Sequence, residues 1–230
     1  MSEQASPQST QQKSAQWNLG RFFETLNFFE AVPVVSWFQQ MFYNSAPPPP
    51  PALQANVVFD FQQPTEDLRQ LWGALDDVVM GGVSASSVQL QPEGMLFTGY
   101  VSTENSGGFA SVRTRNFEPA LNLASYTGIQ LRVRGDGQRY KFFLRDSTAW
   151  DSVAHAYSFD TVANEWIDVR IPFSDMKPVQ RARTIDYRAL DPGRIYSLQV
   201  MLSKFEYDRE LNPHFTPGAF QLLIQSIEVY

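Results

Sequence analysis

The 230-residue sequence predicts an all-β protein, a sandwich or a barrel, preceded by a helical, aromatic-rich extension. From about residue 57 onward, short runs of β-branched and aromatic residues alternate with turn residues, and no long amphipathic helical pattern interrupts them. Roughly ten strands at such spacing are typical of two-sheet sandwiches and barrels. The expected strands are residues 57–61, 83–91, 95–101, 108–115, 128–134, 140–145, 155–159, 166–171, 195–201 and 220–230.

The chain divides into four stretches. Residues 1–16 lack aromatic and large aliphatic side chains after Met1, so we expect a disordered leader. Residues 17–43 are the predicted helical segment, and residues 44–55 are a linker whose five successive prolines predict a stiff, extended spacer. Residues 56–230 form the predicted β-sandwich, in which the residues RGDG predict a tight turn between strands 128–134 and 140–145.

The segment 17–43 is unusually aromatic, because it holds nine of the 32 aromatic residues of the chain. Its apolar residues follow helical spacing, and Pro33 should kink the helix or divide it in two. Polar residues interrupt every window of about 20 residues, which disfavours a membrane-spanning helix. We therefore favour docking on a membrane surface or in a partner's groove, with packing on the chain's own core as the alternative. The candidate docking residues are Trp17, Phe22, Phe23, Phe29, Trp37, Phe38 and Phe42.

Composition excludes several classes of function. The absence of cysteine rules out a disulfide framework, thiolate metal sites and a cysteine nucleophile. The only two histidines, His155 and His214, are too few for a multi-histidine metal site. A net charge of −6 does not supply the basic surface that nucleic acids require. The first residues match neither a secretory nor a mitochondrial leader, so we expect a cytoplasmic chain. We also expect no metal and no cofactor.

The residues DDVVMGGVS at 76–84 are the most informative loop. Two adjacent carboxylates followed by two glycines predict a sharp turn that is able to approach a ligand closely. Three interpretations stay open: a structural turn capped by the acidic side chains, a binding surface, or a calcium site. A second glycine pair, in residues 105–109, precedes a strand that carries Arg113 and Arg115 on one face, and either arginine is expected to pair with Asp76 or Asp77.

No catalytic motif stands out. The Ser, Asp and His residues between 145 and 155 lack the strand–turn–helix nucleophile elbow of a hydrolase, and no dinucleotide-binding glycine pattern follows a strand. Trp72, Trp150 and Trp166 lie near predicted strand ends. Exposed tryptophans serve as stacking platforms in sugar-binding sandwiches, so a carbohydrate-binding module is the alternative to a protein-binding function.

Five segments together closely resemble the complex I intermediate-associated protein 30 family: WGALDDVVMGGVS, FTGYVSTENSGGFASVRTR, GIQLRVRGDGQRYKFFLR, WIDVRIPFSDMKP and FQLLIQSIEVY. The resemblance covers residues 57–230 in order. It implies a galactose-binding-like jelly-roll sandwich and a non-enzymatic assembly factor, or chaperone, for subunits of a membrane complex. The client would be a respiratory complex of the NADH dehydrogenase type or a photosynthetic complex, and the chain would associate peripherally with that membrane, the thylakoid in the photosynthetic case.

The family offers no catalytic residue to transfer, so we expect none. The motif positions form instead a candidate partner-binding surface. Its members are Asp76, Asp77, Met80, Gly81, Gly82, Ser84, Asn105, Gly107, Gly108, Phe109 and Arg113.

Overall fold

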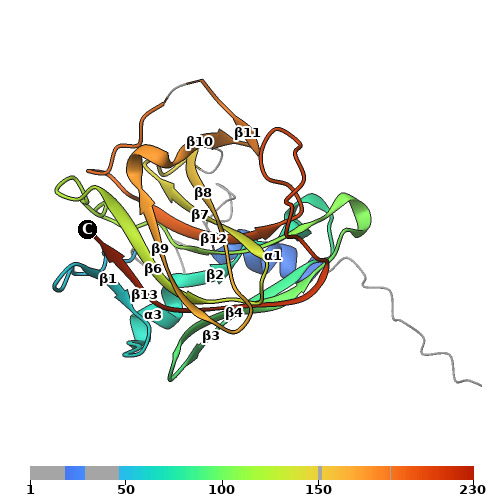
Figure 1. Ribbon diagram of the computed structural model, residues 1–230, viewed down its shortest axis with the longest axis horizontal. Helices are drawn as coiled ribbons and strands as arrows, with labels where there is room; N and C mark the ends of the chain where they lie inside the picture. Colours follow the sequence, from blue (N-terminus) through green and yellow to red (C-terminus); the bar gives the residue numbers. More distant parts are fainter. Residues whose placement is uncertain (1–18, 29–46, 150–151, 187) are drawn as a thin grey trace, which may run out of the picture.

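The structure, a computed structural model, describes residues 19–28, 47–149, 152–186 and 188–230. Two antiparallel β-sheets face each other across a shared apolar core (Figure 1). The all-β sandwich predicted from the sequence is therefore confirmed.

The first sheet, sheet A, has six strands within the described residues, in the order β3-β4-β13-β6-β9, with β1 paired to β13. The long strand β13 is its centre, because it pairs with β1, β4 and β6. The strands are β1 (Val57–Asp60), β3 (Ala85–Gln91), β4 (Gly94–Val101), β6 (Gly128–Arg134), β9 (Trp166–Pro172) and β13 (Gly218–Val229).

The second sheet, sheet B, has seven strands within the described part of the chain, in the order β11-β10-β8-β7-β12-β5-β2. Its central strand β12 pairs antiparallel with both β5 and β7. The strands are β2 (Trp72–Ala74), β5 (Phe109–Thr114), β7 (Arg139–Arg145), β8 (Ala154–Asp160), β10 (Lys177–Gln180), β11 (Arg183–Thr184) and β12 (Ser197–Ser203).

Short helical elements decorate the sandwich. The helix α3 (Glu66–Leu71) begins at Thr65, whose side chain accepts a hydrogen bond from the Leu68 backbone N–H. The described residues also contain the 3₁₀ turns η1 (Asp77–Met80), η2 (Glu104–Ser106) and η3 (Phe173–Asp175). Among the described residues, no helix is both long enough and apolar enough to span a membrane.

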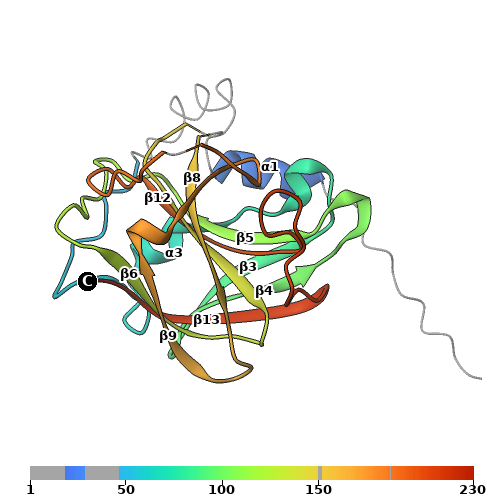
Figure 2. The ribbon, with the colours of Figure 1, turned by 45° about the horizontal axis from the view of Figure 1, so that its top comes forward.

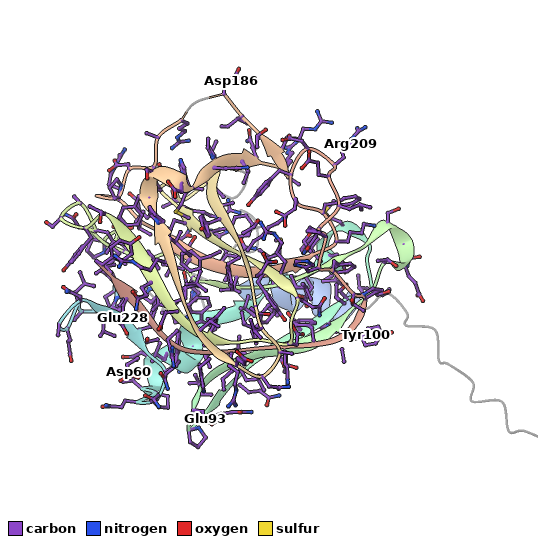
Figure 3. All side chains as sticks on the ribbon, viewed as in Figure 1. Asp60, Glu93, Tyr100, Asp186, Arg209 and Glu228 are labelled. Carbon is purple, nitrogen blue, oxygen red and sulfur yellow. The ribbon has the colours of Figure 1, made fainter. Side chains whose placement is uncertain are left out.

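Alternation along the strands of sheet A builds the core. In β6, Ile129, Leu131 and Val133 are fully buried, while the residues between them are half-exposed. This period of two places one apolar face against the opposite sheet. Side chains from both sheets fill the space between them (Figure 3), including the edge-to-face pair of Phe97 in sheet A and Tyr140 in sheet B, whose ring centroids are 6.4 Å apart.

Sheet B differs because its central strands are buried on both faces. In β12 six of the seven residues are buried, and in β5 five of the six are buried. Leu198, Val200 and Leu202 belong to the core between the sheets. The residues between them, such as Gln199, face outward and are nevertheless covered. The outer face of sheet B is thus the floor of a recess rather than open surface.

The helix α1 (Leu19–Phe28) packs against η1 and β2, and Figure 2 shows it beside the edge of the sandwich. Arg21 anchors it, since its Nη2 donates to Asp76 Oδ2 at 3.0 Å and to the Ser86 carbonyl at 3.1 Å. Packing on the chain's own body, the alternative interpretation from the sequence, thus holds for residues 19–28, where Phe22 is half-buried. The predicted leader, residues 1–16, lies outside the described residues, as do the docking residues Trp17, Phe29, Trp37, Phe38 and Phe42. The side chain of Phe23 is not described.

Candidate functional site

Asp77 is a buried carboxylate that joins three segments of chain. Its Oδ1 accepts a hydrogen bond from the Ser84 backbone N–H at 2.9 Å. Its Oδ2 accepts from Ser84 Oγ at 2.6 Å, from the Gly108 N–H at 2.7 Å and from the Phe109 N–H at 3.3 Å. Four donors compensate the loss of water around a charge that is only 1% exposed. Asp77 therefore fixes η1 to the residue before β3 and to the start of β5.

The glycines of the two motifs make room for this carboxylate. A Cβ atom on Gly82 would lie 2.3 Å from Asp77 Cγ, and one on Gly107 would lie 2.5 Å from Asp77 Oδ2. Gly81 has a different role, because its φ of +90° ends η1 in the left-handed region that favours glycine. The packing around the buried charge of Asp77 thus explains one glycine of each pair, Gly82 and Gly107.

Asp76 forms a second buried junction. It accepts hydrogen bonds from Ser86 Oγ at 2.5 Å, the Ser86 N–H at 2.8 Å and the Ser111 N–H at 3.0 Å, besides the ion pair with Arg21. Burial raises the pKa of Asp76, although the hydrogen bonds and the Arg21 charge oppose that rise. We expected Arg113 or Arg115 to pair with this acidic loop; the ion pair of Asp76 is instead made by Arg21 of α1, a partner 55 positions away in the sequence.

Both carboxylates are therefore structural in their contacts. Within residues 19–28, 47–149, 152–186 and 188–230, no group of three or more histidine and acidic side chains is arranged to hold a metal ion. Ser84, another candidate residue, is also buried and donates its hydroxyl to Asp77. These contacts support a structural role for the acidic residues of the loop 76–84. Asp76, at the N-cap of η1, makes no side-chain capping hydrogen bond, so the two carboxylates join neighbouring segments and do not cap the turn.

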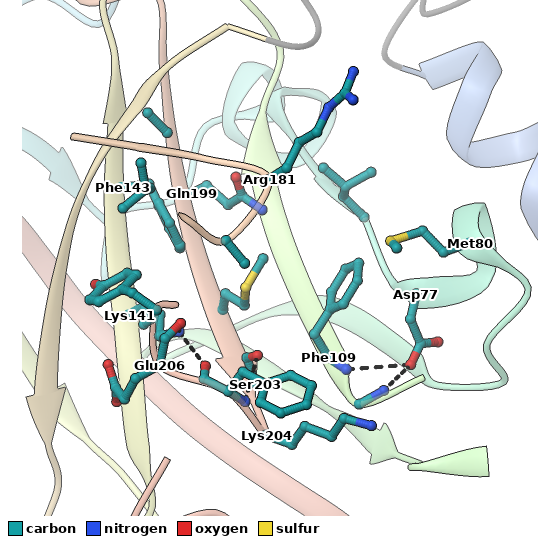
Figure 4. A pocket seen from close by; sticks show the side chains of 18 of the residues that line it. Asp77, Met80, Phe109, Lys141, Phe143, Arg181, Gln199, Ser203, Lys204 and Glu206 are labelled. Atoms are coloured by element: carbon teal, nitrogen blue, oxygen red, sulfur yellow. Dashed lines mark hydrogen bonds between the residues drawn. The ribbon is translucent and has the colours of Figure 1, made fainter. Parts of the chain in front are cut away.

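A pocket of about 550 Å³ lies on the outer face of sheet B (Figure 4). Strands β5, β12, β7 and β8 supply its floor, and β10 with the loop after β12 supplies one wall. The opposite wall is formed by η1 and the glycine loop before β5. Six of the candidate residues line this pocket: Asp77, Met80, Gly107, Gly108, Phe109 and Arg113. The other five lie outside its lining: Asp76, Gly81, Gly82, Ser84 and Asn105.

Apolar side chains cover much of the pocket. Phe143 and Tyr207 pack in a small buried cluster with alanines of β8, and Met201 lies against them. Two large apolar side chains of the lining are exposed to solvent: Met80 is 77% exposed and Phe205 is 37% exposed. Figure 4 places Met80 and Phe143 on opposite sides of the pocket. Exposed apolar side chains around a recess are typical of a binding site for a protein or another partly apolar ligand.

Polar and cationic side chains lie in the floor. Gln199 of β12 donates to Ser111 Oγ at 2.9 Å and accepts from Arg145 Nη2 at 3.4 Å. Arg113 of β5 donates from Nε to Ser197 Oγ at 3.2 Å. Burial, together with the nearby charge of Arg145, lowers the pKa of Arg113 to about 9. Two guanidinium groups therefore share one poorly solvated region of the pocket.

Lys141 of β7 is the most unusual group of the pocket. It is 3% exposed, and its Nζ donates to the backbone carbonyls of Phe205 and Glu206, the second at 2.6 Å. Its ammonium also lies 4.6 Å from the centre of the Tyr207 ring. Burial lowers the pKa of Lys141 to about 8; the Glu206 charge opposes this effect and the Arg139 charge adds to it.

The stability conferred by Lys141 should depend on pH. In the unfolded chain a lysine has a pKa of about 10.4. Between about pH 8 and pH 10 the unfolded state therefore keeps a proton that the folded state has lost, and the contribution of Lys141 to the free energy of unfolding rises with pH. Below about pH 8 both states are charged and the contribution is constant. The wild-type chain should gain stability relative to Lys141→Met as pH rises from 8 to 10.

Urea denaturation at pH 7, 8, 9 and 10 measures this difference. The matched control is Lys177→Met, because Lys177 is an exposed lysine that lies over the same Tyr207 ring at 5.7 Å. The difference in free energy of unfolding between wild type and Lys177→Met should not rise with pH in this way. A difference between wild type and Lys141→Met that stays constant across the series would contradict the assigned pKa.

Sequence reasoning missed the lining residues that come from β7 and β12, among them Lys141, Arg145 and Gln199. One sequence signal could have revealed Lys141. A strand with one solvent-exposed face alternates apolar and polar residues, whereas the run YKFFLR places a lysine among residues that are mostly apolar on both faces. Only the pairing of β7 with β12, which places Gln199 opposite Phe143, brings these side chains together.

The residues weighed for sugar or hydrolase chemistry lie elsewhere. Trp72 is buried against Phe59 and Phe61, and Trp166 lies beside Arg134 on the outer face of sheet A, 5.1 Å from its guanidinium. Trp150 lies outside the described residues. His155 is buried, with its Nε2 2.9 Å from the Arg188 carbonyl oxygen.

The fold and its recessed sheet face define a β-sandwich of the galactose-binding-like, jelly-roll class. The family model named Complex I intermediate-associated protein 30 matches residues 59–224. The chain belongs to this family. Both the resemblance found in the sequence and the expected fold class are therefore confirmed.

A curated relative and two solved structures are also similar to this chain. An uncharacterised protein of Schizosaccharomyces pombe is 28% identical over 184 residues, which span 73% of this chain and 81% of the relative. Among solved structures, the family 11 carbohydrate-binding module of the Clostridium thermocellum cellulase Lic26A-Cel5E is similar, with a TM-score of 0.53 and 16% identity over 77% of this chain and 95% of the module. The same module in complex with a β-1,3-1,4-mixed-linked tetrasaccharide gives a TM-score of 0.52 at 16% identity, over 76% of this chain and 94% of the module. At such low identity these structures share the fold.

Proposed function

We propose that this chain is a non-enzymatic assembly factor that holds a segment of a membrane-complex subunit in the pocket on the outer face of sheet B. The family, named for association with complex I intermediates, supports a respiratory client of the NADH dehydrogenase type. A photosynthetic complex is the second client class that the sequence resemblance implies.

The observation that carries the proposal is the pocket itself. It is roomy, at about 550 Å³, and its lining combines buried aromatic side chains with the exposed Met80 and Phe205. Burying one such apolar side chain against a partner contributes about 1.5–3 kcal/mol. An incompletely assembled subunit exposes apolar segments that its final neighbours will later cover, so a recess of this kind fits such a segment.

A second contact completes the proposed mode of action. A client in a membrane would bring the chain to the membrane surface, and the aromatic residues of 17–43 beyond the described helix are proposed to contribute to that peripheral association. A tethered second contact raises the effective concentration of the first. The pocket remains the site that distinguishes one client from another.

The test removes the apolar contacts at the pocket without altering the core or the net charge. In a Met80→Gln/Phe205→Gln double variant, the recovery of client subunits by affinity purification and quantitative mass spectrometry should fall at least about tenfold, as expected for the loss of about 1.4 kcal/mol or more. The matched control is Leu211→Gln/Tyr100→Gln, because these side chains are 71% and 52% exposed and lie outside the pocket lining.

Three results would count against the proposal. Equal recovery with both double variants would remove the pocket from client binding. Recovery of no respiratory or photosynthetic subunit with the wild-type chain would remove the assembly function. Saturable binding of the mixed-linked tetrasaccharide, measured by calorimetry and lost in the pocket variant, would favour a carbohydrate-binding module in its place.

A further inference from the structure

The pocket is cationic although the chain is acidic. The described residues that line it include five cationic side chains and two carboxylates, a formal charge of +3, whereas the whole chain carries −6. The cationic residues are Arg113, Lys141, Arg145, Arg181 and Lys204, and the acidic ones are Asp77 and Glu206. The recess is thus positive within a chain of opposite net sign, and its apolar walls strengthen the local field.

Both carboxylates of the lining have donors from the protein itself. Asp77 accepts the four hydrogen bonds that join η1 to β3 and β5. Glu206 accepts from Arg139 Nε at 2.8 Å and from Ser158 Oγ at 2.6 Å. Arg139 does not line the pocket. The acidic groups of the lining are thus held by structural contacts, and the field that a ligand meets is positive.

The cations are distributed between floor and mouth. Arg113 and Arg145 lie in the floor, where each raises the electrostatic cost of the other's charge. Arg181 is exposed and Lys204 is half-exposed, and Figure 4 shows them on different sides of the recess. Apolar side chains such as Phe109 and Met201 lie among these cations in the lining. A ligand that fills the pocket therefore meets both cationic and apolar groups.

We propose that the pocket selects an acidic, apolar polypeptide segment, one in which glutamate or aspartate side chains lie beside leucine or phenylalanine. This inference rests on the proposed function and names the chemistry of the client segment. Carboxylates match the guanidinium groups in charge and in geometry, and the apolar side chains match the aromatic walls. A neutral sugar satisfies the second requirement in part and the first not at all.

The test uses the full purified chain and a set of fluorescein-labelled dodecapeptides with amidated C-termini. Every peptide carries leucine and phenylalanine at four fixed positions, and the remaining positions are glutamate, glutamine or lysine in a serine background. Fluorescence anisotropy should show the glutamate peptide binding about tenfold more tightly than the glutamine peptide, with the lysine peptide weaker still. A glutamate peptide whose leucines and phenylalanines are replaced by serine should also lose about tenfold.

Charge reversal at the mouth locates this preference in the pocket. The Arg181→Glu/Lys204→Glu variant should weaken the glutamate peptide about tenfold or more and change the glutamine peptide less than about twofold. The matched control is Arg183→Glu/Arg209→Glu, which makes the same change in net charge at two exposed arginines outside the lining. It should leave the glutamate peptide within about twofold of wild type.

The outcomes separate the two proposals. Equal affinity for glutamate and glutamine peptides, or equal loss in the pocket and control variants, would overturn the acidic preference while leaving the client test with Met80 and Phe205 standing. Clear discrimination by the purified chain, combined with no membrane subunit in the affinity purification, would keep the preference and reject the assembly function.

Discussion

Asp77→Asn is expected to lower the free energy of unfolding by about 3 kcal/mol or more, one of the two largest effects that the structure predicts. The substitution keeps the size of the side chain but replaces one acceptor oxygen by an NH₂ donor. Each oxygen of Asp77 receives hydrogen bonds, from Ser84 at Oδ1 and from Ser84, Gly108 and Phe109 at Oδ2. Either orientation of the amide therefore sets donor against donor in a buried place.

Equilibrium denaturation in urea measures the loss, and Asp208→Asn is the matched control. Asp208 also accepts from a backbone N–H and a hydroxyl of one residue, Thr184, at 2.9 and 2.6 Å. It is exposed, so water replaces the lost acceptor and the effect should be far smaller. Equal effects of the two substitutions would show that burial of Asp77 does not set its contribution.

The second large effect is expected from an added methyl group beside the same carboxylate. Gly82→Ala would place a Cβ atom 2.3 Å from Asp77 Cγ and 2.8 Å from Asp77 Cβ. Relief requires movement of a side chain that four hydrogen bonds hold in place, so we expect a loss of about 3 kcal/mol. Gly107→Ala, at 2.5 Å from Asp77 Oδ2, should behave similarly.

Thermal and urea denaturation of the alanine variants test this packing argument. Gly193→Ala is the control, since its nearest neighbour, Asp191 Oδ1, lies at 3.2 Å and its other neighbours at 3.9 Å. The Gly107→Ala penalty should also shrink in an Asp77→Ala background, because the two positions contact each other. A Gly82→Ala chain as stable as Gly193→Ala would mean that the loop adapts freely.

The sequence predicted the longer strands closely, because their apolar residues alternate or run together over many positions. The strand predicted at 128–134 is β6 with the same bounds, and 166–171 is one residue shorter than β9. Very short strands such as β2 and β11 were not predicted, since two or three residues carry no periodicity. The tight turn predicted after Arg134 is wrong: residues 135–138 contain a bridge from Gly135 to Ala163 and a bend, and they carry the chain from one sheet to the other. Local turn chemistry does not encode that crossing.

The candidate site was predicted only in part. The acid and glycine motif led to Met80, Phe109 and Arg113, and these three residues line the pocket. It did not reveal that Asp76 and Ser84 are buried, because a carboxylate that caps loops and one that binds a ligand have the same sequence pattern. Lys141 became a site residue only when β12 paired with β7, through contacts about 60 positions apart.

The ion pair between Arg21 and Asp76 links the first helix to the β-sandwich, so removing or substituting one partner affects the other. The guanidinium of α1 is 30% exposed and its acidic partner is 1% exposed, so a chain that starts after the proline run would leave a charge inside the sandwich without its counterion. Shortened versions would therefore differ from the full chain in the body itself as well as in what they lack. Substitutions at positions 21 and 76 are expected to be tolerated in concert more readily than singly, which gives related sequences a pair of positions whose covariation would report whether the first helix sits on the body throughout the family.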